Sequence, residues 1–509
     1  DTYKMAIPLF NSIASWFLKK RIHQIELFTK YPHEVQQEVL QDLLRVSEQT
    51  QVGLKYEYGS INNYEIFKRR VPIVIYEDIA PQIKRCRKGE GNIFWPTPIK
   101  WFAKSSGTTD NKSKYIPVSV EALEQCHYKA GKDMLSLYFN NNPESELFTG
   151  KNLRLGGSQE IYDNSTSYFG DLSAIIIDNM PFWAEISSTP SHKISLMPEW
   201  ETKMDAILKE SIKENVTSFA GVPSWLLVLF NKVLDHTSKK NIFEVWPNLE
   251  VYFHGGVSFK PYQSQYDNLF PGSQLKYYET YNASEGFFGI QDLNNSDEML
   301  LMLDYGIFYE FIPVEGSDED IIPLSAVEIN KYYSLVITTN GGLWRYKIGD
   351  VVKFTSILPF RIQVAGRTKH YINAFGEELM IENADMALSR VSKKLGLDII
   401  DYTVAPIFMD GKVKGAHQWL IEFYTAPDDL NQFAGLLDKT LRELNSDYDA
   451  KRYKGLTMRM PEIISAKPKL FYKWLSENKK LGGQHKVPRL SNNRDLIDEL
   501  IVFNATKLL

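Results

Sequence analysis

Short apolar runs of strand length alternate with longer amphipathic segments between about residues 95 and 350. This alternation limits the fold most, because strands that alternate with helices are typical of an α/β domain with a largely parallel sheet. The strand-like runs are Val216–Ala220, Leu249–His254, Leu275–Tyr281 and Ser334–Thr339, and the helix-like segments include Glu121–Asn140, Glu199–Glu214 and Ser224–Thr237. Ligands of such sheets bind at the loops beyond the strand ends.

The pattern differs at the two ends of the chain. Residues 6–80 favour helices, as in His33–Thr50, where apolar residues recur at helical spacing. After Arg367 the pattern is that of a compact α+β unit. We therefore predict a large α/β domain over 1–366, with β-sheets flanked by helices, and a smaller mobile α+β domain over 367–509, with Gly366 and Gly376 as flexible points.

Composition excludes several classes of protein. The formal net charge is −5, which argues against a general nucleic-acid-binding surface. The chain has two cysteines, Cys86 and Cys126, and neither belongs to a CxxC pair, so we expect no zinc ribbon or disulfide framework. No apolar run approaches the ~20 residues of a membrane span, so we expect no integral membrane association. The first 25 residues resemble an amphipathic helix rather than a signal peptide, and we expect a cytoplasmic protein.

The first candidate for chemistry is the loop Ser105-Ser106-Gly107-Thr108-Thr109, followed by Lys114. Hydroxyls and backbone N–H groups beside a glycine can hold phosphate oxygens, and a lysine adds a positive charge. The flanking residues resemble strands, so the loop is expected to lie in a hairpin rather than to open a helix, and no Walker A loop is present. Taken alone, the segment is equally compatible with a polar surface turn.

A second candidate, Tyr281-Asn282-Ala283-Ser284-Glu285-Gly286, leaves the end of a predicted strand. Tyr281 could stack on a base and Ser284 could donate to a phosphate. Glu285 could bind Mg²⁺, which prefers carboxylate and phosphate oxygens. An exposed glutamate in an ordinary turn is the alternative.

Three further positions follow along the chain. Asp350 comes after a glycine at a strand end, where a carboxylate can accept hydrogen bonds from a ribose diol. Arg367 could bind ribose or phosphate, and Lys369 lies where a hinge would turn. Lys486 follows two glycines and precedes Pro488, so a movable loop could carry its ammonium group into a site and out again. Each of these has an ordinary structural alternative.

Taken in order, the segments SSGTT with a following lysine, YNASEG, YKIGD, GR-K and QHKVPR resemble the acyl-adenylate-forming superfamily. Within it, the chain is most similar to the auxin-responsive Gretchen Hagen three family of acyl acid-amido synthetases. RRVPIVIYEDIAPQI, GVPSWLL, LWRYKIGD, AHQWLIEF and LNSDYDAKR support that choice, and the resemblance extends over about residues 64–490.

The resemblance implies a ligase that uses ATP and Mg²⁺. A carboxylic acid would form an acyl-adenylate, and an amine, usually an amino acid, would then displace AMP. The implied nucleotide contacts are Ser105, Ser106, Gly107, Thr108, Thr109, Lys114, the glycine turn Gly255-Gly256, Tyr281, Ser284, Asp350 and Arg367. Glu285 would hold the metal, Lys369 would be the hinge, and Lys486 would stabilise the adenylation transition state.

The acyl pocket is predicted at Val222 and Trp225, in the segment GVPSWLLVL, and at Tyr128 in an earlier helix. Core packing is the alternative for each of them. An acyl-CoA ligase with the same first step and a non-catalytic nucleotide or acid sensor remain as alternative functions. The sequence leaves the acid, the acceptor, the oligomeric state and the populated domain arrangement open.

Overall fold

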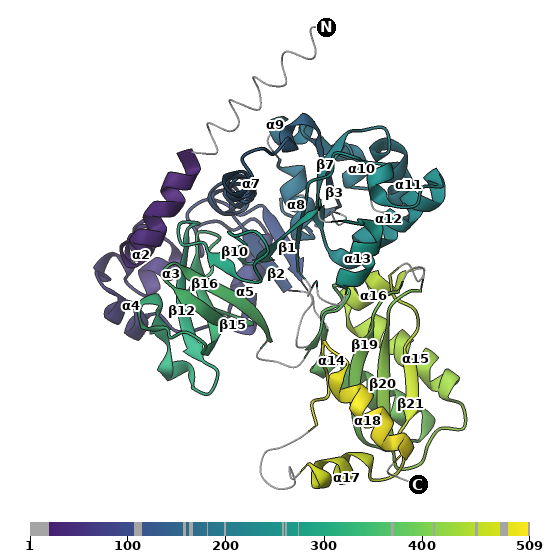
Figure 1. Ribbon diagram of the computed structural model, residues 1–509. Helices are drawn as coiled ribbons and strands as arrows, with labels where there is room; N and C mark the ends of the chain where they lie inside the picture. Colours follow the sequence, from purple (N-terminus) through teal and green to yellow (C-terminus); the bar gives the residue numbers. More distant parts are fainter. Residues whose placement is uncertain are drawn as a thin grey trace.

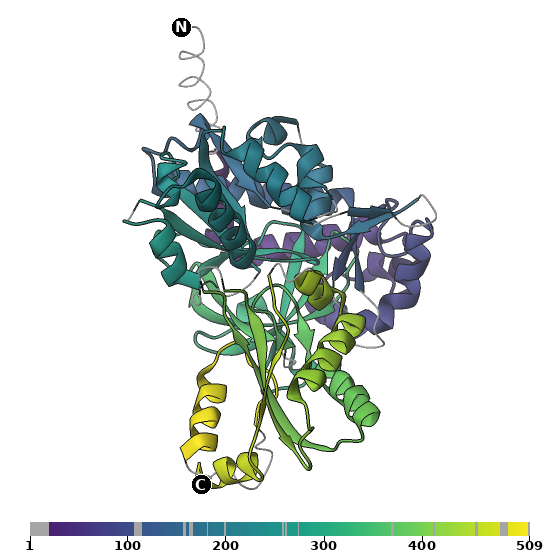
Figure 2. The ribbon, with the colours of Figure 1, turned by 90° about the vertical axis from the view of Figure 1, so that its right-hand side faces the viewer.

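The computed structural model contains a large α/β part followed by a smaller α+β part, which lies below it in Figures 1 and 2. This confirms the predicted fold class. The structure describes residues 20–105, 114–155, 159–161, 166–180, 182–197, 200–256, 259, 262–272, 274–367, 371–410, 413–453, 457–478 and 487–506.

Helices form the N-terminal region, as predicted. Residues 20–30 are helical, and α2 (Pro32–Ser47), α3 (Gln51–Lys55), α4 (Tyr64–Arg70) and α5 (Tyr76–Arg87) follow. In α2 a proline occupies the first helical position, where a missing N–H does no harm, and Leu40, Leu43 and Leu44 form the buried stripe. The side-chain amide of Gln36 donates to the carbonyls of Leu303 and Ile307, which ties α2 to the main sheet.

A twelve-stranded sheet forms the centre of the large part. In spatial order its strands are β13 (Ile322–Pro323), β12 (Ile307–Pro313), β14 (Tyr332–Thr339), β15 (Tyr346–Ile357), β16 (Phe360–Arg367), β11 (Met299–Leu301), β10 (Gly286–Ile290), β9 (Lys276–Ala283), β8 (Val251–Gly255), β7 (Val216–Gly221), β3 (Lys151–Arg154) and β6 (Ser188–Thr189). The four strands expected from the sequence are β7, β8, β9 and β14, each displaced by at most two residues at either end.

The expectation of a largely parallel sheet is wrong for more than half of it. Only β6, β3, β7, β8 and β9 run parallel, and helical crossovers connect them. From β9 to β13 every pairing is antiparallel. Short connections such as the turn between β9 and β10 explain this, because a hairpin can join only antiparallel neighbours. We call these two portions the parallel half and the antiparallel half.

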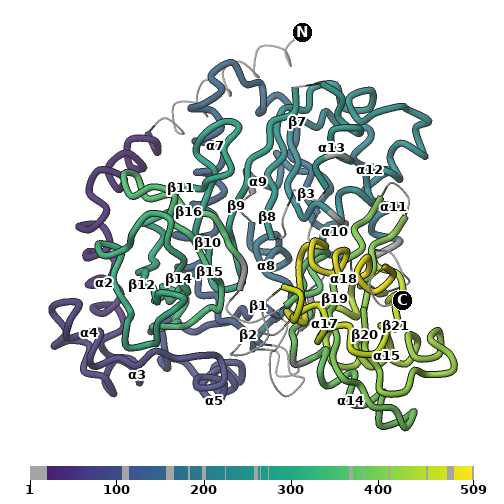
Figure 3. Tube along the Cα trace, turned by 60° about the horizontal axis from the view of Figure 1, so that its bottom comes forward, coloured from purple at the N-terminus to yellow at the C-terminus, as the bar shows by residue number. Residues whose placement is uncertain are grey.

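Helices cover both portions of the large part. They are α6 (Val120–Ala122), a π-helical turn (Leu123–Tyr128), α7 (Lys129–Asn141), α8 (Leu172–Asp178), α9 (Phe182–Ile186), α10 (His192–Ser195), α11 (Trp200–Ser211), α12 (Pro223–Thr237) and α13 (Gln263–Leu269). Helices α11, α12 and α13 lie on the same side of β3, β7 and β8 (Figures 1 and 3). A separate four-stranded sheet has the order β2 (Lys114–Val118), β1 (Trp101–Ser105), β5 (Tyr168–Gly170) and β4 (Gln159–Ile161). None of the helices in the described ranges has both the length and the apolarity needed to cross a membrane.

The C-terminal part contains three paired strands with helices around them. Its elements are β17 (Tyr371–Ile372), β18 (Leu379–Met380), α14 (Ile381–Leu395), β19 (Ile399–Ile407), β20 (Ala416–Phe423), α15 (Leu430–Leu444), α16 (Ser446–Arg452), β21 (Glu462–Ser465), α17 (Leu470–Glu477) and α18 (Asp495–Thr506). One hydrophobic cluster includes residues of α11–α13 and of this part, so the two parts pack against each other. The Tyr262 hydroxyl also donates to the carbonyl of Ala374 across the boundary.

Candidate nucleotide and acyl site

The parallel strands β7, β8 and β9 end at one edge of the sheet. Their register pairs Gly221 with His254 and Gly255 with Thr280. The predicted glycine turn therefore lies directly beside the strand that carries Tyr281. This is the edge where ligands of α/β sheets bind.

Close packing requires glycine at this turn. A Cβ atom on Gly255 would lie 2.4 Å from the carbonyl oxygen of Thr280, and Gly256 has a φ of +80°. The side-chain amide of Asn373, from the C-terminal part, donates to the carbonyl of Gly256 over 3.1 Å. Burial lowers the pKa of the neighbouring His254 to about 3, so this imidazole is neutral at pH 7.

Two of the predicted nucleotide contacts bind each other. The Tyr281 hydroxyl donates to Oδ2 of Asp350 over 2.7 Å, and each residue is 6% exposed. Asp350 also pairs in register with Arg367 on the adjacent strand β16. Three residues that are far apart in sequence thus converge at one point, and the phenol fixes the orientation of the carboxylate.

Ser284 and Glu285 form the turn between β9 and β10, and both are half-buried. Within the described ranges, no three His, Cys, Asp or Glu side chains form a metal-binding group. Glu285 nevertheless fits Mg²⁺, since this ion commonly binds one or two carboxylates and takes its remaining ligands from substrate phosphates and water.

The predicted hairpin is present, with Ser105 paired with Lys114 across β1 and β2. The Tyr76 hydroxyl accepts a hydrogen bond from the backbone N–H of Tyr115 on β2. Two residues earlier, Val74 bonds in both directions with the backbone on either side of Tyr346. Residues 74–76, at the start of α5, therefore connect the end of the hairpin that adjoins its loop to the start of β15, the strand that carries Asp350.

The proposed acyl-pocket residues lie in two places. Val222 and Trp225 are at the start of α12 and pack against the hydrophobic cluster that α11–α13 share with the C-terminal part. Tyr128 packs against a separate hydrophobic cluster. The Tyr128 hydroxyl donates to the carbonyl of Ile176 in α8. The ammonium group of Lys451, from α16, lies 4.0 Å from the centre of the Trp225 ring. This contact places Lys451 between the two parts of the molecule, and burial there lowers the pKa of its ammonium group.

Six of the predicted site residues lie outside the described residues: Ser106, Gly107, Thr108, Thr109, Lys369 and Lys486. Arg367 is described through its backbone only. The predicted N-terminal amphipathic helix likewise falls mostly outside the described ranges, which begin at residue 20. The roles assigned to these residues stay predictions.

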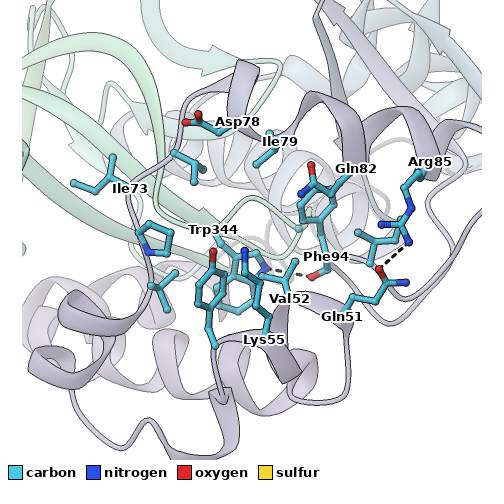
Figure 4. A pocket seen from close by; sticks show the side chains of 16 residues that line it. Gln51, Val52, Lys55, Ile73, Asp78, Ile79, Gln82, Arg85, Phe94 and Trp344 are labelled. Atoms are coloured by element: carbon cyan, nitrogen blue, oxygen red, sulfur yellow. Dashed lines mark hydrogen bonds between the residues drawn. The ribbon is translucent and has the colours of Figure 1, made fainter.

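A cavity of about 590 Å³ lies apart from this site, between α3, α5 and the segment that precedes β15. Figure 4 shows Val52, Gln82, Phe94 and Trp344 around it, with Arg85 bonded to Gln51 at one side. The Trp344 indole donates to the carbonyl of Phe94 over 3.2 Å. None of the predicted site residues lines this cavity, so it is separate from the predicted nucleotide and acyl site.

Sequence reasoning missed two residues at the boundary between the parts, Asn373 and Lys451. Their contacts with Gly256 and Trp225 join segments more than one hundred residues apart. No local pattern could have indicated them. It also missed Arg154, for which a signal existed, because this charged residue stands between Leu153 and Leu155 just before Gly156-Gly157.

Two solved structures of ligases share this fold. An acyl acid amido synthetase in complex with 2,4-DB matches with a TM-score of 0.62 and 19% identity, and the match covers 95% of this chain and 96% of that one. 2-Hydroxyisobutyryl-CoA ligase, in complex with 2-HIB-AMP and CoA, matches with a TM-score of 0.58 and 14% identity over 93% of both chains. The fold is thus one found both in amide-forming and in thioester-forming ligases.

Family models assign the chain more narrowly. The GH3 family N-terminal, central and C-terminal domains match residues 21–275, 300–367 and 382–495. The chain belongs to the GH3 family. An indole-3-acetic acid-amido synthetase of Arabidopsis thaliana is 23% identical, over 92% of this chain and 91% of its own length. A jasmonoyl-L-amino acid synthetase of Oryza sativa subsp. japonica is also 23% identical, over 93% of this chain and 95% of its own length.

Proposed function

We propose that this chain is an ATP-dependent acyl acid-amido synthetase, which activates a carboxylic acid as an acyl-adenylate and transfers the acyl group to an amino acid. The observation that carries the proposal is the bond between Tyr281 and Asp350 beside the Gly255-Gly256 turn. It brings motifs from distant parts of the chain to one edge of the sheet, in a family whose named relatives are amido synthetases.

The reaction has two balanced steps. In the first, a carboxylate oxygen of the acid attacks the α-phosphorus of ATP, and the bond from that phosphorus to pyrophosphate breaks. In the second, the amine nitrogen attacks the acyl carbon, the bond to AMP breaks, and the nitrogen loses a proton. No covalent bond to the enzyme is needed, so the chain's task is to position the reactants and stabilise charge.

The predicted site residues divide this task. Asp350, oriented by Tyr281, accepts hydrogen bonds from the ribose hydroxyls, and Arg367 donates hydrogen bonds to the ribose. Gly255 and Gly256 form the turn beside the adenine, and the turn keeps this shape because a side chain at Gly255 would collide with Thr280. The loop Ser105–Thr109 and Lys114 hold the phosphates, and Ser284 contacts the α-phosphate. Val222, Trp225 and Tyr128 contact the acyl group.

Glu285 would hold Mg²⁺ at this site. The bound ion would supply positive charge where negative charge accumulates on the phosphate oxygens. Lys486 supplies a second positive charge during adenylation. Removal of one such stabilising group commonly lowers the rate about 10²–10³-fold.

The two parts of the molecule correspond to two proposed domains, 1–366 and 367–509, with Lys369 as the hinge. Rotation about the hinge would withdraw Lys486 and admit the amine. The contacts of Asn373 with Gly256 and of Lys451 with Trp225 belong to the arrangement seen here, and a rotated arrangement would break them.

We further propose a cytoplasmic enzyme whose partners are small molecules rather than nucleic acid or membrane. The net charge of −5 supports this, as do the two buried free thiols. Burial raises the pKa of Cys86 and of Cys126 to about 12, which leaves both unreactive at neutral pH.

The test begins with ATP–pyrophosphate exchange in the presence of Mg²⁺, across a panel of aryl and aliphatic acids with no acceptor added. Exchange that depends on one class of acid would establish the first step. Amino acids and CoA are then supplied with that acid, and the products are identified by mass spectrometry. An amide is the expected product, whereas a thioester alone would identify an acyl-CoA ligase. ATP binding without exchange for any acid would favour a sensor and contradict the proposal.

A further inference from the structure

Arg154 is a buried cation at the ligand-binding edge of the parallel half. It is the last residue of β3, it pairs in register with Ala220 on β7, and it is only 7% exposed. The next residue, Leu155, lies close to Gly221, since a Cβ atom on Gly221 would be 3.8 Å from that of Leu155. Arg154 is therefore next to the start of α12, where Val222 and Trp225 form the proposed acyl pocket.

The guanidinium group of Arg154 lacks the partners that a buried charge needs. Its Nη1 contacts the thioether sulfur of Met180, which is only a weak acceptor. Among the described residues, neither Nε nor Nη2 has a hydrogen-bond acceptor. Burial lowers the pKa of Arg154, and the charge of Glu185 opposes this only in part. A buried guanidinium without an anion is strongly destabilising unless something pairs with it.

Other largely buried arginines in the described ranges have ion pairs. These are Arg21 with Asp133 and Asp304, Arg345 with Glu310, Arg361 with Asp292, and Arg452 with Asp438. The chain thus neutralises arginines that serve only its fold. Arg154 differs from these four in having no carboxylate bound to it, although it is buried as deeply as most of them.

The position of Arg154 limits which carboxylate could reach it. Strands β3 and β9 are separated by β7 and β8, and three strand spacings are roughly 14 Å. An arginine side chain is shorter than that distance. The carboxylate that attacks ATP is expected next to Ser284 and Glu285, which follow β9, so it lies beyond the reach of Arg154.

We propose that Arg154 binds a second carboxylate, one that is carried by a substrate but is not activated. Two sources have this chemistry: the α-carboxylate of the acceptor amino acid, and the distal carboxylate of a dicarboxylic acid. The forked N–H groups of Nε and Nη2 suit a carboxylate because they can bind both of its oxygens. This inference rests on the proposed function, because it names a specificity contact of that site.

The first experiment needs no substrate. Arg154→Met removes the charge and keeps an apolar chain of similar length, and its urea midpoint is compared with that of the natural protein. If the arginine is held for a ligand, the variant is as stable or more stable, since it no longer buries an unpaired charge. A clear loss of stability would show that Arg154 serves the fold and would overturn the proposal.

The second experiment measures ligand binding by the shift in thermal midpoint. Amino acids are compared with their α-carboxamides, and dicarboxylic acids are compared with their half-amides. A carboxylate compound should raise the midpoint of the natural protein and not that of Arg154→Met, and the matching amide should raise neither. Equal shifts in both proteins would contradict the proposal. This experiment gives a result even if the ligase activity is not found.

Kinetics then distinguish the two sources, with Lys151→Met as the matched control. Lys151 begins the same strand and pairs with Glu214. If the carboxylate belongs to the acceptor, Arg154→Met raises the KM for the amino acid by about 10- to 100-fold and leaves exchange unchanged. If it belongs to the acid, the KM in the exchange reaction rises for the dicarboxylic acid alone. The KM of Arg154→Lys should lie between that of the natural protein and that of Arg154→Met.

Two results would separate the failure of this inference from failure of the proposed function. Unchanged KM values for every substrate in Arg154→Met, together with normal exchange, would refute the role of Arg154 alone. Absence of exchange in the natural protein, with the midpoint shifts as predicted, would refute the ligase and leave the carboxylate site.

Discussion

Arg345 and Arg154 are both buried arginines: Arg345 immediately precedes β15 in the antiparallel half of the central sheet, and Arg154 ends β3 in the parallel half. Arg345, in the antiparallel half, makes a two-pronged bond with Glu310 and donates to the carbonyls of Lys68 and Val71. Arg154, in the parallel half, contacts a single thioether. Each of the three guanidinium nitrogens of Arg345 has an oxygen acceptor, whereas Nε and Nη2 of Arg154 have none among the described residues.

The difference indicates a division of labour between the two halves. In the antiparallel half, the buried charge of Arg345 is paired, and its bonds fix the start of β15 and thereby the position of Asp350. Its backbone at Arg345 has a φ of +43°, a strained value that the surrounding bonds hold in place. The parallel half ends in glycine turns, half-buried pocket residues and an unneutralised charge. These are the features expected where substrates bind.

The largest expected effect comes from removing the positive charge of Arg345. Arg345→Met should lower the free energy of unfolding by about 3–5 kcal/mol, because Glu310 would remain buried and unpaired. Urea denaturation measures this. The double variant Arg345→Met with Glu310→Leu should recover part of the loss. An unchanged urea midpoint in Arg345→Met would contradict the proposed difference between Arg345 and Arg154.

Acid should destabilise the protein through two buried histidines, His254 on β8 of the parallel half and His127 in the π-helical turn Leu123–Tyr128. Burial lowers the pKa of His127 to about 4 and that of His254 to about 3, below the value of about 6.5 expected in the unfolded chain. As the pH falls below 6.5, the unfolded state therefore binds protons first, and stability falls. Between pH 7 and pH 5 each histidine should remove about 2 kcal/mol.

Urea midpoints at pH 7 and pH 5 test this pH dependence. The dependence should be smaller in His254→Asn and in His127→Asn, and unchanged in the control His23→Asn, whose side chain is 79% exposed. The same pH dependence in all three variants would contradict the assignment.

The smallest effects concern two glycines. Gly255→Ala should destabilise the protein by about 1–3 kcal/mol and weaken ATP binding, because the new methyl group meets the backbone of Thr280. Gly435→Ala is the matched control, since it lies inside α15 with nothing within 4 Å of its Cβ position. It should stabilise the protein by about 0.5–1 kcal/mol. Calorimetry and ATP titration measure both, and unchanged ATP affinity in Gly255→Ala would argue against the turn as part of the site.

Strands β7, β8 and β9 of the parallel half could be predicted from the sequence, because they coincide with the largely apolar runs, and the ligand edge follows from strand direction. Tyr281 and Asp350 were indicated as strand-end residues, and the structure brings them together. The predicted position of Asp350 is wrong, because β15 continues to Ile357 and Asp350 lies inside it. Their direct bond could not be predicted, since it depends on the order of strands β9–β16. The backbone pairing of Val74 with the start of β15 could not be predicted either, because the two segments are far apart in the sequence.

The antiparallel half was harder to predict from the sequence for a physical reason. Short strands such as β11 and β13 have three and two residues, too few to show any period. Arg154 teaches the opposite lesson. Its charge between Leu153 and Leu155 was visible in the sequence, but its lack of a partner can be seen only when the surrounding side chains are in place.

The central claim is that the Tyr281–Asp350 pair marks an adenylating site, and one measurement tests it most directly. ATP–pyrophosphate exchange is measured with the best acid for the natural protein, for Asp350→Asn and for Tyr281→Phe. The exposed Asp318, which pairs with Lys347, provides the control variant Asp318→Asn. We expect acid-dependent exchange in the natural protein and the control. In Asp350→Asn, kcat/KM for ATP should fall by about 10- to 100-fold, with a smaller loss in Tyr281→Phe. Equal exchange in all four proteins would contradict the account.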